Sequence, residues 1–272
     1  MLTALALASL LAAGNPGPAA AAAPGAAALP PGELGKVVRL GRSLFDETDT
    51  HPLTKPYVKN ALTCASCHPD SGAGAAATLV GAATAYPAWS TREKAVITLE
   101  DRILNCFMRS MNGVRPPNGS PPSVALTAYV TWLSAGLPVA MNPRYPKGPR
   151  ALAPLPVFAD EVNVQRGRTV FEARCATCHG KDGDGNPPLW GPRSYNAGAG
   201  FADVEKLAAF VRATMPYGDP TLSDSEAVDV AAFVNAQPRP DFRLREHLPN
   251  GASYNSALRD ELVRAPTWPP RE

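Results

Sequence analysis

The sequence lacks an excess of charge of either sign, since 26 Lys and Arg residues against 24 Asp and Glu leave a net charge of +2. A chain this balanced has no basic stripe of the kind that binds a phosphate backbone, which argues against nucleic acid as a partner. A long hydrophobic run is missing too. The longest apolar stretch, residues 1–13, falls short of the roughly 20 residues of a membrane span, so we expect no transmembrane helix.

Charge is missing altogether before Glu33, where a Leu- and Ala-rich core is followed by mostly small residues. This composition is typical of the hydrophobic region and cleavage zone of a secretory signal peptide. The Lys or Arg residues that usually begin such a peptide are absent, so a misplaced start codon or an Ala-rich arm are the alternatives. We favour export, and we begin the folded part of the chain near Pro31.

Cysteine is scarce as well, and four of the five cysteines fall in two copies of the motif C-x-x-C-H. The copies are Cys64, Cys67 and His68, and Cys175, Cys178 and His179. On a helical turn residues i and i+3 share a face, so both thiols can bond the vinyl groups of one haem while the histidine reaches its iron. A zinc site would need a second ligand pair close by, and a redox dithiol rarely comes as a pair with histidine attached. The motifs therefore predict two covalently bound haem c groups, attached outside the cytoplasm.

The two motifs belong to an internal repeat. Gly41 and Phe45 precede the first motif on a helical pattern, and Gly167 and Phe171 precede the second. A Gly with an aromatic residue one turn later suits a close helix crossing, because Gly has no Cβ to hold the partner helix away. After each motif a further helix is predicted, at residues 123–135 and 225–237, with Ser123 and Ser225 as the caps.

We interpret the chain as all-α, with two tandem class I-like cytochrome c domains joined by a Pro-rich linker. The length of 272 residues also favours two domains, since a domain typically has roughly 150 residues. The chain holds 30 prolines, and those of the linker favour a stiff, extended connection. The expected parts are a leader at 1–30, a first domain at 31–137, the linker at 138–157, a second domain at 158–240 and a C-terminal tail at 241–272.

The sixth iron ligand differs between the two halves. In the second half Met215, followed by Pro216, lies 36 residues after His179 and predicts a His/Met iron of raised potential. The first half has no Met-Pro pair, and Cys106, the fifth cysteine, lies 38 residues after His68. The place of Cys106 in the repeat matches that of Met215.

Residues 98–113 are predicted to form the helix that carries Cys106, with Thr98 and Asp101 as a capping box and Asn112-Gly113 as the stop. At 100° per residue, the residues within about 60° of Cys106 are Arg102, Arg109 and Ser110, and those on the opposite side are Leu104, Met108 and Met111. One regular helix cannot offer both faces to one iron, so periodicity leaves two interpretations open. Either Cys106 is the ligand, or the polar residues mark a solvent face and Met108 is the ligand. A free surface thiol is a liability in an oxidising compartment, which favours Cys106 slightly.

Over about residues 34 to 240 the chain resembles a known family, the dihaem, tetrathionate-forming thiosulfate dehydrogenases of the bacterial periplasm. The resemblance is carried by both haem motifs, Tyr86-Pro87, residues 102–113, residues 188–196 and Met215-Pro216. It implies that Cys106 is the axial ligand of the active-site haem, and that Arg92, Arg102 and Ser110 belong to the substrate site. Two departures stand out: position 88 is Ala where the family has Ser, although Ser90 is near, and Thr214 precedes Met215 where some members have a Lys that can replace the Met.

This set of residues suits the joining of two thiosulfates into tetrathionate. The reaction releases two electrons, and two haem irons can accept one each. Arg92 and Arg102 can offer paired donors to sulfonate oxygens, with Arg109 as a further candidate, whereas for Lys94 and Arg115 a solvated charge or a haem-propionate partner is the favoured interpretation.

A thiolate ligand should depress the potential of the first haem, so electrons would run from substrate to haem one, to haem two and to an external acceptor such as a soluble c-type cytochrome. Cys106 could also leave the metal and take a transient sulfur adduct.

Two other functions stay open. One is a dihaem electron carrier without chemistry of its own, and the other is a cysteine-ligated haem subunit of sulfur oxidation that acts with a separate carrier protein. A haem peroxidase is less attractive, because nothing marks an open distal site. His51 and His247, each near a Pro in a polar stretch, are expected at the surface. The tail, with a helical-looking piece at residues 256–264, is assigned to packing or disorder.

Overall fold

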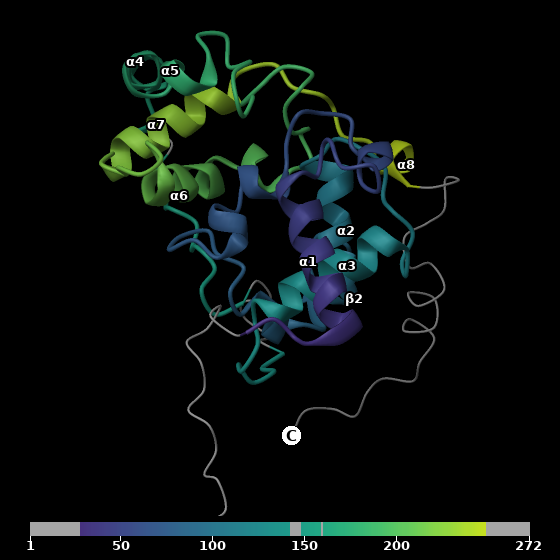
Figure 1. The fold of residues 1–272 in the computed structure, drawn as a ribbon. Coiled ribbons are helices and arrows are strands. Elements are labelled where there is room, and N and C mark those ends of the chain that lie inside the picture. Colours follow the sequence, from purple (N-terminus) through teal and green to yellow (C-terminus); the bar gives the residue numbers. More distant parts are fainter. Residues whose placement is uncertain (1–27, 142–147, 159, 249–272) are drawn as a thin grey trace, which may run out of the picture.

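The computed structural model describes residues 28–141, 148–158 and 160–248, so residues 1–27 of the predicted leader and the helical-looking piece at 256–264 lie outside the described residues. The helices are α1 (Gly32–Asp46), α2 (Leu99–Arg109), α3 (Pro121–Trp132), α4 (Val164–Arg174), α5 (Ala176–His179), α6 (Val204–Thr214), α7 (Asp224–Asn235) and α8 (Leu244–His247). Two short strands, β1 (Ala88–Ser90) and β2 (Ala95–Ile97), follow the first haem motif. The helices form two groups, α1 to α3 and α4 to α7 (Figure 1).

The first group is built on the crossing of α1 and α3. A Cβ on Gly41 would stand 2.0 Å from the carbonyl oxygen of Ala125, so only glycine lets the two helices approach this closely. Leu44, Phe45 and Tyr129 fill the buried core beside the crossing. The close crossing predicted at Gly41 is confirmed.

The second group repeats this arrangement with α4 and α7. A Cβ on Gly167 would stand 2.0 Å from the carbonyl oxygen of Asp229. Phe171 packs beneath this crossing against Trp190 and Phe233, with ring centroids 5.0 and 5.4 Å away. The internal repeat predicted from the glycine and aromatic spacing is therefore present in three dimensions.

The helix caps differ from the prediction in detail. The helix α3 begins at Pro121 after Ser120, not at Ser123, because two prolines occupy its first turn. Ser223, not Ser225, caps α7, because it completes a capping box with Glu226 three residues later. Both predicted caps were therefore wrong by one turn or less.

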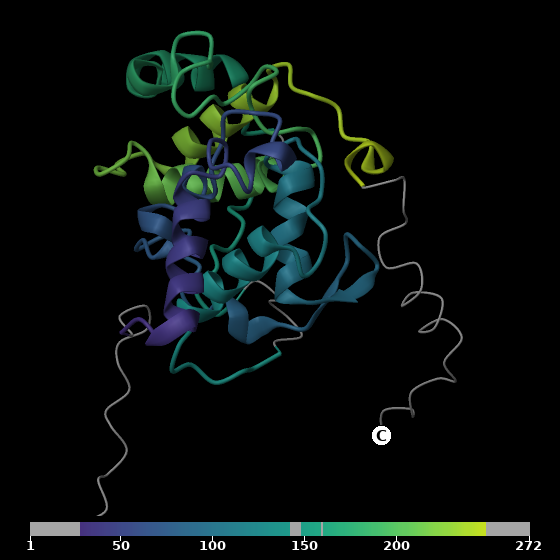
Figure 2. The ribbon, with the colours of Figure 1, turned by 45° about the vertical axis from the view of Figure 1, so that its right-hand side comes forward.

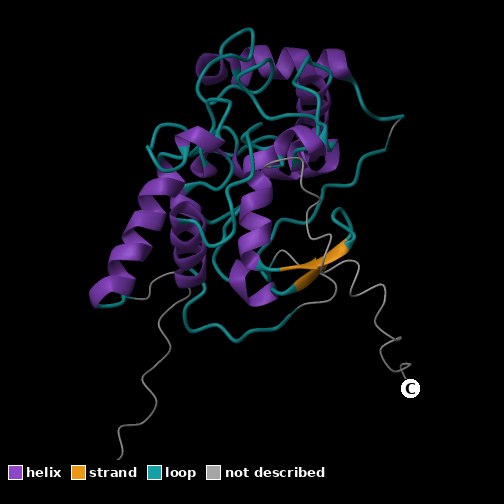
Figure 3. Cartoon of the chain, turned by 90° about the vertical axis from the view of Figure 1, so that its right-hand side faces the viewer, coloured by secondary structure: helices purple, strands orange, loops and turns teal. Residues whose placement is uncertain are grey.

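The expectation of an all-α chain needs one correction, since helices dominate but two strands pair in an antiparallel hairpin (Figure 3). Trp89 faces Val96 across the hairpin on its exposed side, while the neighbouring pairs are more buried. Three residues per strand are too few for a readable alternation of apolar and polar positions. The hairpin holds Arg92 in its turn and lies beside α2 (Figure 2).

The two helical groups are in direct contact. Asn60 donates through its Nδ2 to the carbonyl oxygens of both Ser110 and Ser194, at 2.7 and 3.0 Å. Asn196, buried completely, donates to the carbonyl oxygen of Met108 at 2.9 Å. The loop that follows the second haem motif thus packs on the end of α2, so the groups are not merely tethered to each other.

The described residues between the groups form no helix or strand. Ala140 donates its backbone N–H to Thr84, and Leu155 donates to Glu205, so both ends of this segment are held against the protein. Within the described ranges, none of the helices has the length and apolar character that crossing a membrane requires.

Candidate functional site

Each C-x-x-C-H motif lies on a helical turn of its own. In the first motif a 3-10 turn spans Cys64–Ser66, and in the second α5 follows Cys175 directly. In both, the backbone N–H of the histidine donates to the carbonyl oxygen of the first cysteine at 3.0 Å. The two cysteines of each motif therefore share one face of a turn, as double attachment to one haem requires.

The histidines fit an axial iron ligand. The Nδ1 of His68 lies 2.9 Å from the carbonyl oxygen of Ala77, and the Nδ1 of His179 lies 2.8 Å from that of Pro187. A carbonyl can only accept, so each Nδ1 carries the proton and each Nε2 keeps a free lone pair for a metal. Burial lowers the pKa of His68, and the charge of Arg102 lowers it further, which favours the neutral ring that a metal binds.

Cys106 lies near the first motif. Burial raises the pKa of Cys64 and Cys67 to about 12, and the charge of Cys106 acts on both in the same direction. The Sγ of Cys106 accepts a hydrogen bond from Nη1 of Arg102 at 3.2 Å. Met108, two residues further along α2, is fully buried on the other face of the helix. Cys106 thus lies on the face of α2 opposite Met108 and within electrostatic range of both cysteines of the first motif.

The helix α2 positions these groups. Thr98 and Asp101 form the predicted capping box, so the start of the helix is confirmed. The helix ends at Arg109 rather than at Asn112-Gly113, and Asn112 adopts the left-handed conformation with φ at +47°. Ser110 is the residue directly after α2, one turn beyond Cys106 on the same face.

Arg109 lies within electrostatic range of two other arginines, Arg92 and Arg102. Burial lowers the pKa of Arg109, and the charges of Arg92 and Arg102 act in the same direction. The pKa of Arg102 is raised, chiefly by the charge of Cys106. Arg92 is exposed and donates through Nη1 to the carbonyl oxygen of Gly198 at 3.2 Å.

One carboxylate stands beside these arginines. Glu93 pairs with Arg109 at 3.2 Å, with both side chains about nine-tenths buried. The other carboxylate oxygen of Glu93 takes the hydroxyl of Ser90, so this serine is engaged with Glu93 rather than turned to a substrate. Among the described residues, Glu93 is the acid in ion-pair contact with the group formed by Arg92, Arg102 and Arg109. The group therefore keeps a net positive charge, which suits an anion.

Arg115 and Lys94 contribute differently. Arg115 is buried and pairs with Asp101 at 2.8 Å, and it also contacts Asn118. Lys94 is exposed in the hairpin turn. Lys94 is exposed, as a solvated charge would be, whereas Arg115 is buried in an ion pair and is not a solvated charge; a haem-propionate role for either stays a prediction. Tyr86, by contrast, is buried, which raises its pKa, while the nearby charge of Arg102 acts to lower it; the sequence indicated no role for this residue.

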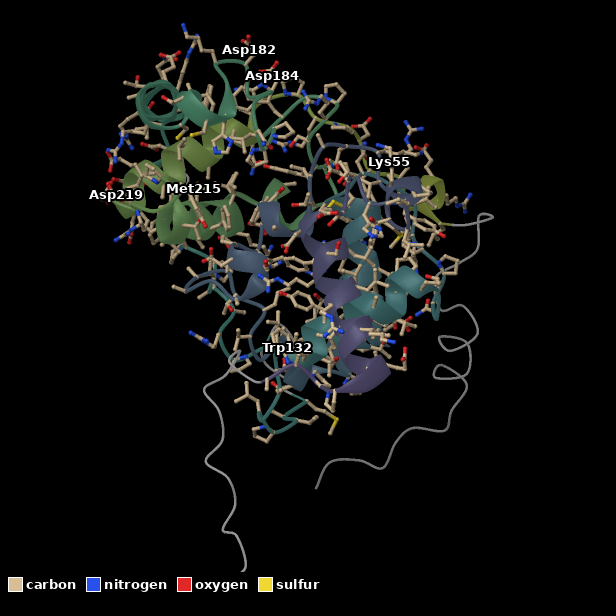
Figure 4. The ribbon with its side chains drawn as sticks, viewed as in Figure 1. Lys55, Trp132, Asp182, Asp184, Met215 and Asp219 are labelled. Carbon is tan, nitrogen blue, oxygen red and sulfur yellow. The ribbon has the colours of Figure 1, made fainter. Side chains whose placement is uncertain are left out.

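Met215 directly follows the last residue of α6 and is half-buried in the second helical group (Figure 4). Gly183, in the loop after the second motif, lies under the ring of Trp190, where a Cβ would stand 2.2 Å from the ring. Burial raises the pKa of Cys175 to about 11. Cys175 packs against the apolar cluster that contains Phe171 and Trp190, whereas Cys178 is exposed.

The prediction that His247 lies at the surface was wrong. Its side chain is only 6% exposed, and its Nδ1 lies 2.6 Å from the carbonyl oxygen of Gly113. The segment around it returns from the second helical group to the first, a contact that the Pro-rich local sequence does not indicate. His51 is half-buried in a turn, where its Nδ1 accepts the N–H of Leu53.

Fold and motifs together define a c-type cytochrome with two haem domains. Residues 53–139 match the family model described as SoxA/TsdA, cytochrome c domain, and residues 162–234 match the one described as cytochrome C oxidase, cbb3-type, subunit III. The predicted pair of cytochrome c domains and the two covalently bound haem c groups are confirmed.

Similar proteins identify the family of c-type cytochromes to which the chain belongs. A thiosulfate dehydrogenase of Thiomonas intermedia is 42% identical over 227 residues, covering 80% of this chain and 70% of that protein. Another, from Allochromatium vinosum, is 40% identical over 240 residues and covers 81% and 84%. The solved thiosulfate dehydrogenase TsdBA from Marichromatium purpuratum, in its as-isolated form, has a TM-score of 0.75 at 37% identity and covers 87% of this chain; this chain spans 51% of that one. The chain belongs to the thiosulfate dehydrogenase family, as the resemblance predicted.

Proposed function

We propose that this protein oxidises two thiosulfate ions to tetrathionate and passes the two electrons to an external acceptor. The observation that supports this proposal is the hydrogen bond from Arg102 to the Cys106 sulfur, together with the electrostatic effect of Cys106 on both cysteines of the first motif. Membership of the thiosulfate dehydrogenase family supports the same reaction.

Electrostatics explain why the arginines are needed. Two dianions at about 6 Å repel each other by on the order of 10 kcal/mol at an effective dielectric near 20. Arg92 and Arg102 would bind the sulfonate groups, and Ser110 would add a hydroxyl donor from the same face of α2. Arg109 contributes charge, but its guanidinium is already engaged by Glu93.

In this proposal Cys106 would be both a ligand of the first haem iron and the nucleophile. The Cys106 thiolate and the sulfane sulfur of one thiosulfate join in an S–S bond with release of two electrons. The sulfane sulfur of a second thiosulfate then attacks the outer sulfur of this adduct, tetrathionate leaves, and the thiolate is restored with no proton exchanged. Arg102, which donates to the Cys106 sulfur, favours its anionic form at the start and at the end of this sequence.

The two haems supply two one-electron acceptors. His68 and Cys106 would be the iron ligands in the first domain, and His179 and Met215 those in the second. A thiolate ligand lowers an iron potential and a His/Met pair raises it, so electrons would move from the first domain to the second and then to a soluble c-type cytochrome or a similar acceptor. The favoured location is the periplasm.

The proposed division of the chain follows from these roles. Residues 31–137 form the active-site domain and residues 158–240 the electron-transfer domain, with 138–157 as the Pro-rich linker, 1–30 as the leader and 241–272 as the tail.

Replacement of Cys106 tests the proposal. The variants Cys106→Ala and Cys106→Met should lose thiosulfate-dependent reduction of an acceptor cytochrome while the second haem remains reducible by dithionite. Low-temperature EPR of the oxidised protein should show a thiolate-ligated low-spin iron that the variants lack. Retained turnover in either variant would refute the role of Cys106.

The alternative of a sulfur-oxidation subunit is kept because the model matched by the first domain covers both SoxA and TsdA. Purified protein with thiosulfate and an acceptor cytochrome, and no carrier protein, separates the two functions. Tetrathionate formation supports the dehydrogenase. Activity only with a sulfur-carrier protein supports the subunit, and reduction only by a partner protein indicates an electron carrier.

A further inference from the structure

The segment of residues 238–248, here called the return segment, runs from the second helical group back to the first. It begins where Gly191 donates to the carbonyl oxygen of Pro238 at 2.8 Å, and it ends where Arg115 donates to that of His247 at 2.9 Å. Its helix α8 lies beside the first group, away from α4 to α7 (Figure 1). The family model that matches the second domain ends at residue 234, so this segment lies beyond it.

Phe242 is the contact between the return segment and the arginine group. The guanidinium carbon of Arg109 lies 4.4 Å from the centroid of the Phe242 ring, within the range of a cation–π interaction. The imidazole of His247 stacks on the same ring at 5.0 Å, which fixes the orientation of the phenyl group. The Phe242 ring is thus held by His247 of the return segment while it contacts Arg109 of α2.

Phe242 also packs directly on Gly198. A Cβ added to Gly198 would lie 2.4 Å from the ring, so the backbone of this loop rests on the phenyl group. The carbonyl oxygen of Gly198 is the acceptor of the hydrogen bond from Arg92. The position of this acceptor therefore depends on the ring beneath it.

Two paths lead from Phe242 to the hairpin that holds Arg92. One runs through the loop at Gly198 to the guanidinium of Arg92 itself. The other runs through Arg109 to Glu93, the residue next to Arg92 in the hairpin turn. Both sets of contacts restrain the guanidinium of Arg92, so loss of the Phe242 ring would weaken its support through Gly198 and through Glu93.

We propose that Phe242 is a positioning residue, which holds Arg92 and Arg109 in the arrangement that binds a sulfur oxyanion at Cys106. This inference rests on the proposed function for the identity of the anion. It assigns to the return segment, which joins the end of the second domain to the tail, a role in the substrate affinity of the first domain. Preorganised side chains bind more tightly, because less rotational freedom is lost when the ligand arrives.

The test uses the holoprotein and compares Phe242→Leu with Phe242→Trp. Leucine keeps much of the volume but offers no π face, whereas tryptophan keeps the face. Leu244→Ala is the control, because Leu244 lies in the same segment and is 41% exposed. Gly198→Ala serves as a second variant that displaces the ring without removing it.

Two readouts are needed. The KM for thiosulfate reports on the reaction, and the Kd for sulfate, an unreactive tetrahedral dianion, reports on the arginine group by calorimetry. We expect Phe242→Leu and Gly198→Ala to raise both values about 5- to 30-fold, equivalent to about 1 to 2 kcal/mol, with kcat within about twofold. Phe242→Trp should recover most of the loss. The EPR spectrum of the first haem should stay as in the wild type.

The outcomes separate this inference from the proposed function. If Phe242→Leu matches Leu244→Ala in both readouts, or if it changes the first haem's spectrum together with KM, the positioning role is overturned. If sulfate binding weakens as expected in a protein that does not oxidise thiosulfate, the positioning role stands and the proposed function fails. If the wild type neither binds sulfate nor oxidises thiosulfate, both are refuted.

Discussion

The contact between Arg102 and Cys106 gives a sharp prediction for the variant Arg102→Gln. The Nη1 of Arg102 lies 3.2 Å from the Cys106 sulfur, and the thiolate is the main cause of the raised pKa of this arginine. A hydrogen bond to a charged group is worth about 1.5 to 3 kcal/mol, and glutamine keeps a donor but loses the charge. We expect kcat/KM for thiosulfate to fall about 10- to 150-fold, at 1.36 kcal/mol per tenfold.

The control for this variant is Arg39→Gln. Arg39 lies on the exposed face of α1, so its loss changes the net charge of the protein equally without touching the site. Arg102→Lys should give an intermediate loss, because lysine keeps the charge but lacks the planar fork of the guanidinium. The assay is steady-state reduction of an acceptor cytochrome at fixed ionic strength. If Arg102→Gln and Arg39→Gln agree within about twofold, the guanidinium does not act at Cys106.

Two further predictions concern stability. Gly41→Ala places a methyl group 2.0 Å from the Ala125 oxygen and should lower the free energy of unfolding by at least about 1 to 3 kcal/mol, whereas Gly200→Ala, with open space around it, should be close to neutral in the same thermal unfolding assay. Burial acts to raise the pKa of Glu100, but hydrogen bonds from Gly119, Ser123 and Asn118 outweigh it and hold the pKa below its ordinary value of 4.5. Since the folded pKa is depressed, this carboxylate stabilises the protein above the unfolded pKa, and the contribution is lost as the pH falls through the folded pKa. The Tm difference between wild type and Glu100→Gln should therefore shrink as the pH is lowered from about 7 to about 3, and a constant difference would contradict it.

Short sequence patterns correctly predicted the haem-attachment turns, the two helix crossings and the capping box of α2. The C-x-x-C-H motifs lie on helical turns because their spacing matches one turn, and Gly41 and Gly167 mark helix crossings because a Cβ would collide there. The capping box at the start of α2 was readable because both of its partners lie within four residues. For the haem motifs and the capping box the cause lies within a few residues of the pattern, whereas the glycines were readable because a residue without a Cβ one turn before an aromatic residue is itself a local signal.

The remaining features depend on contacts across long sequence separations. Phe242 meets Arg109, which is 133 residues away, and His247 meets Gly113 across a similar span. No periodicity records such a pairing, so a histidine in a polar, Pro-rich stretch resembled a surface residue. Glu93 stood beside Arg92 in the sequence, but only its buried pairing with Arg109 shows that it neutralises one cation of the group.

The two halves of the repeat carry the same attachment motif, so the motif alone does not make one of them a catalyst. The surroundings differ. Where the second half has Met215 at the end of α6, the first has Cys106 on a helix that also carries Arg102 and Arg109. Three guanidinium groups with one carboxylate leave an uncompensated positive charge that suits a dianion, whereas the second motif lies beside an aromatic pair, Trp190 and Phe233. If Cys106 and the arginines act as proposed, one different side chain within a repeated fold, supported by cations, would separate substrate chemistry from electron transfer.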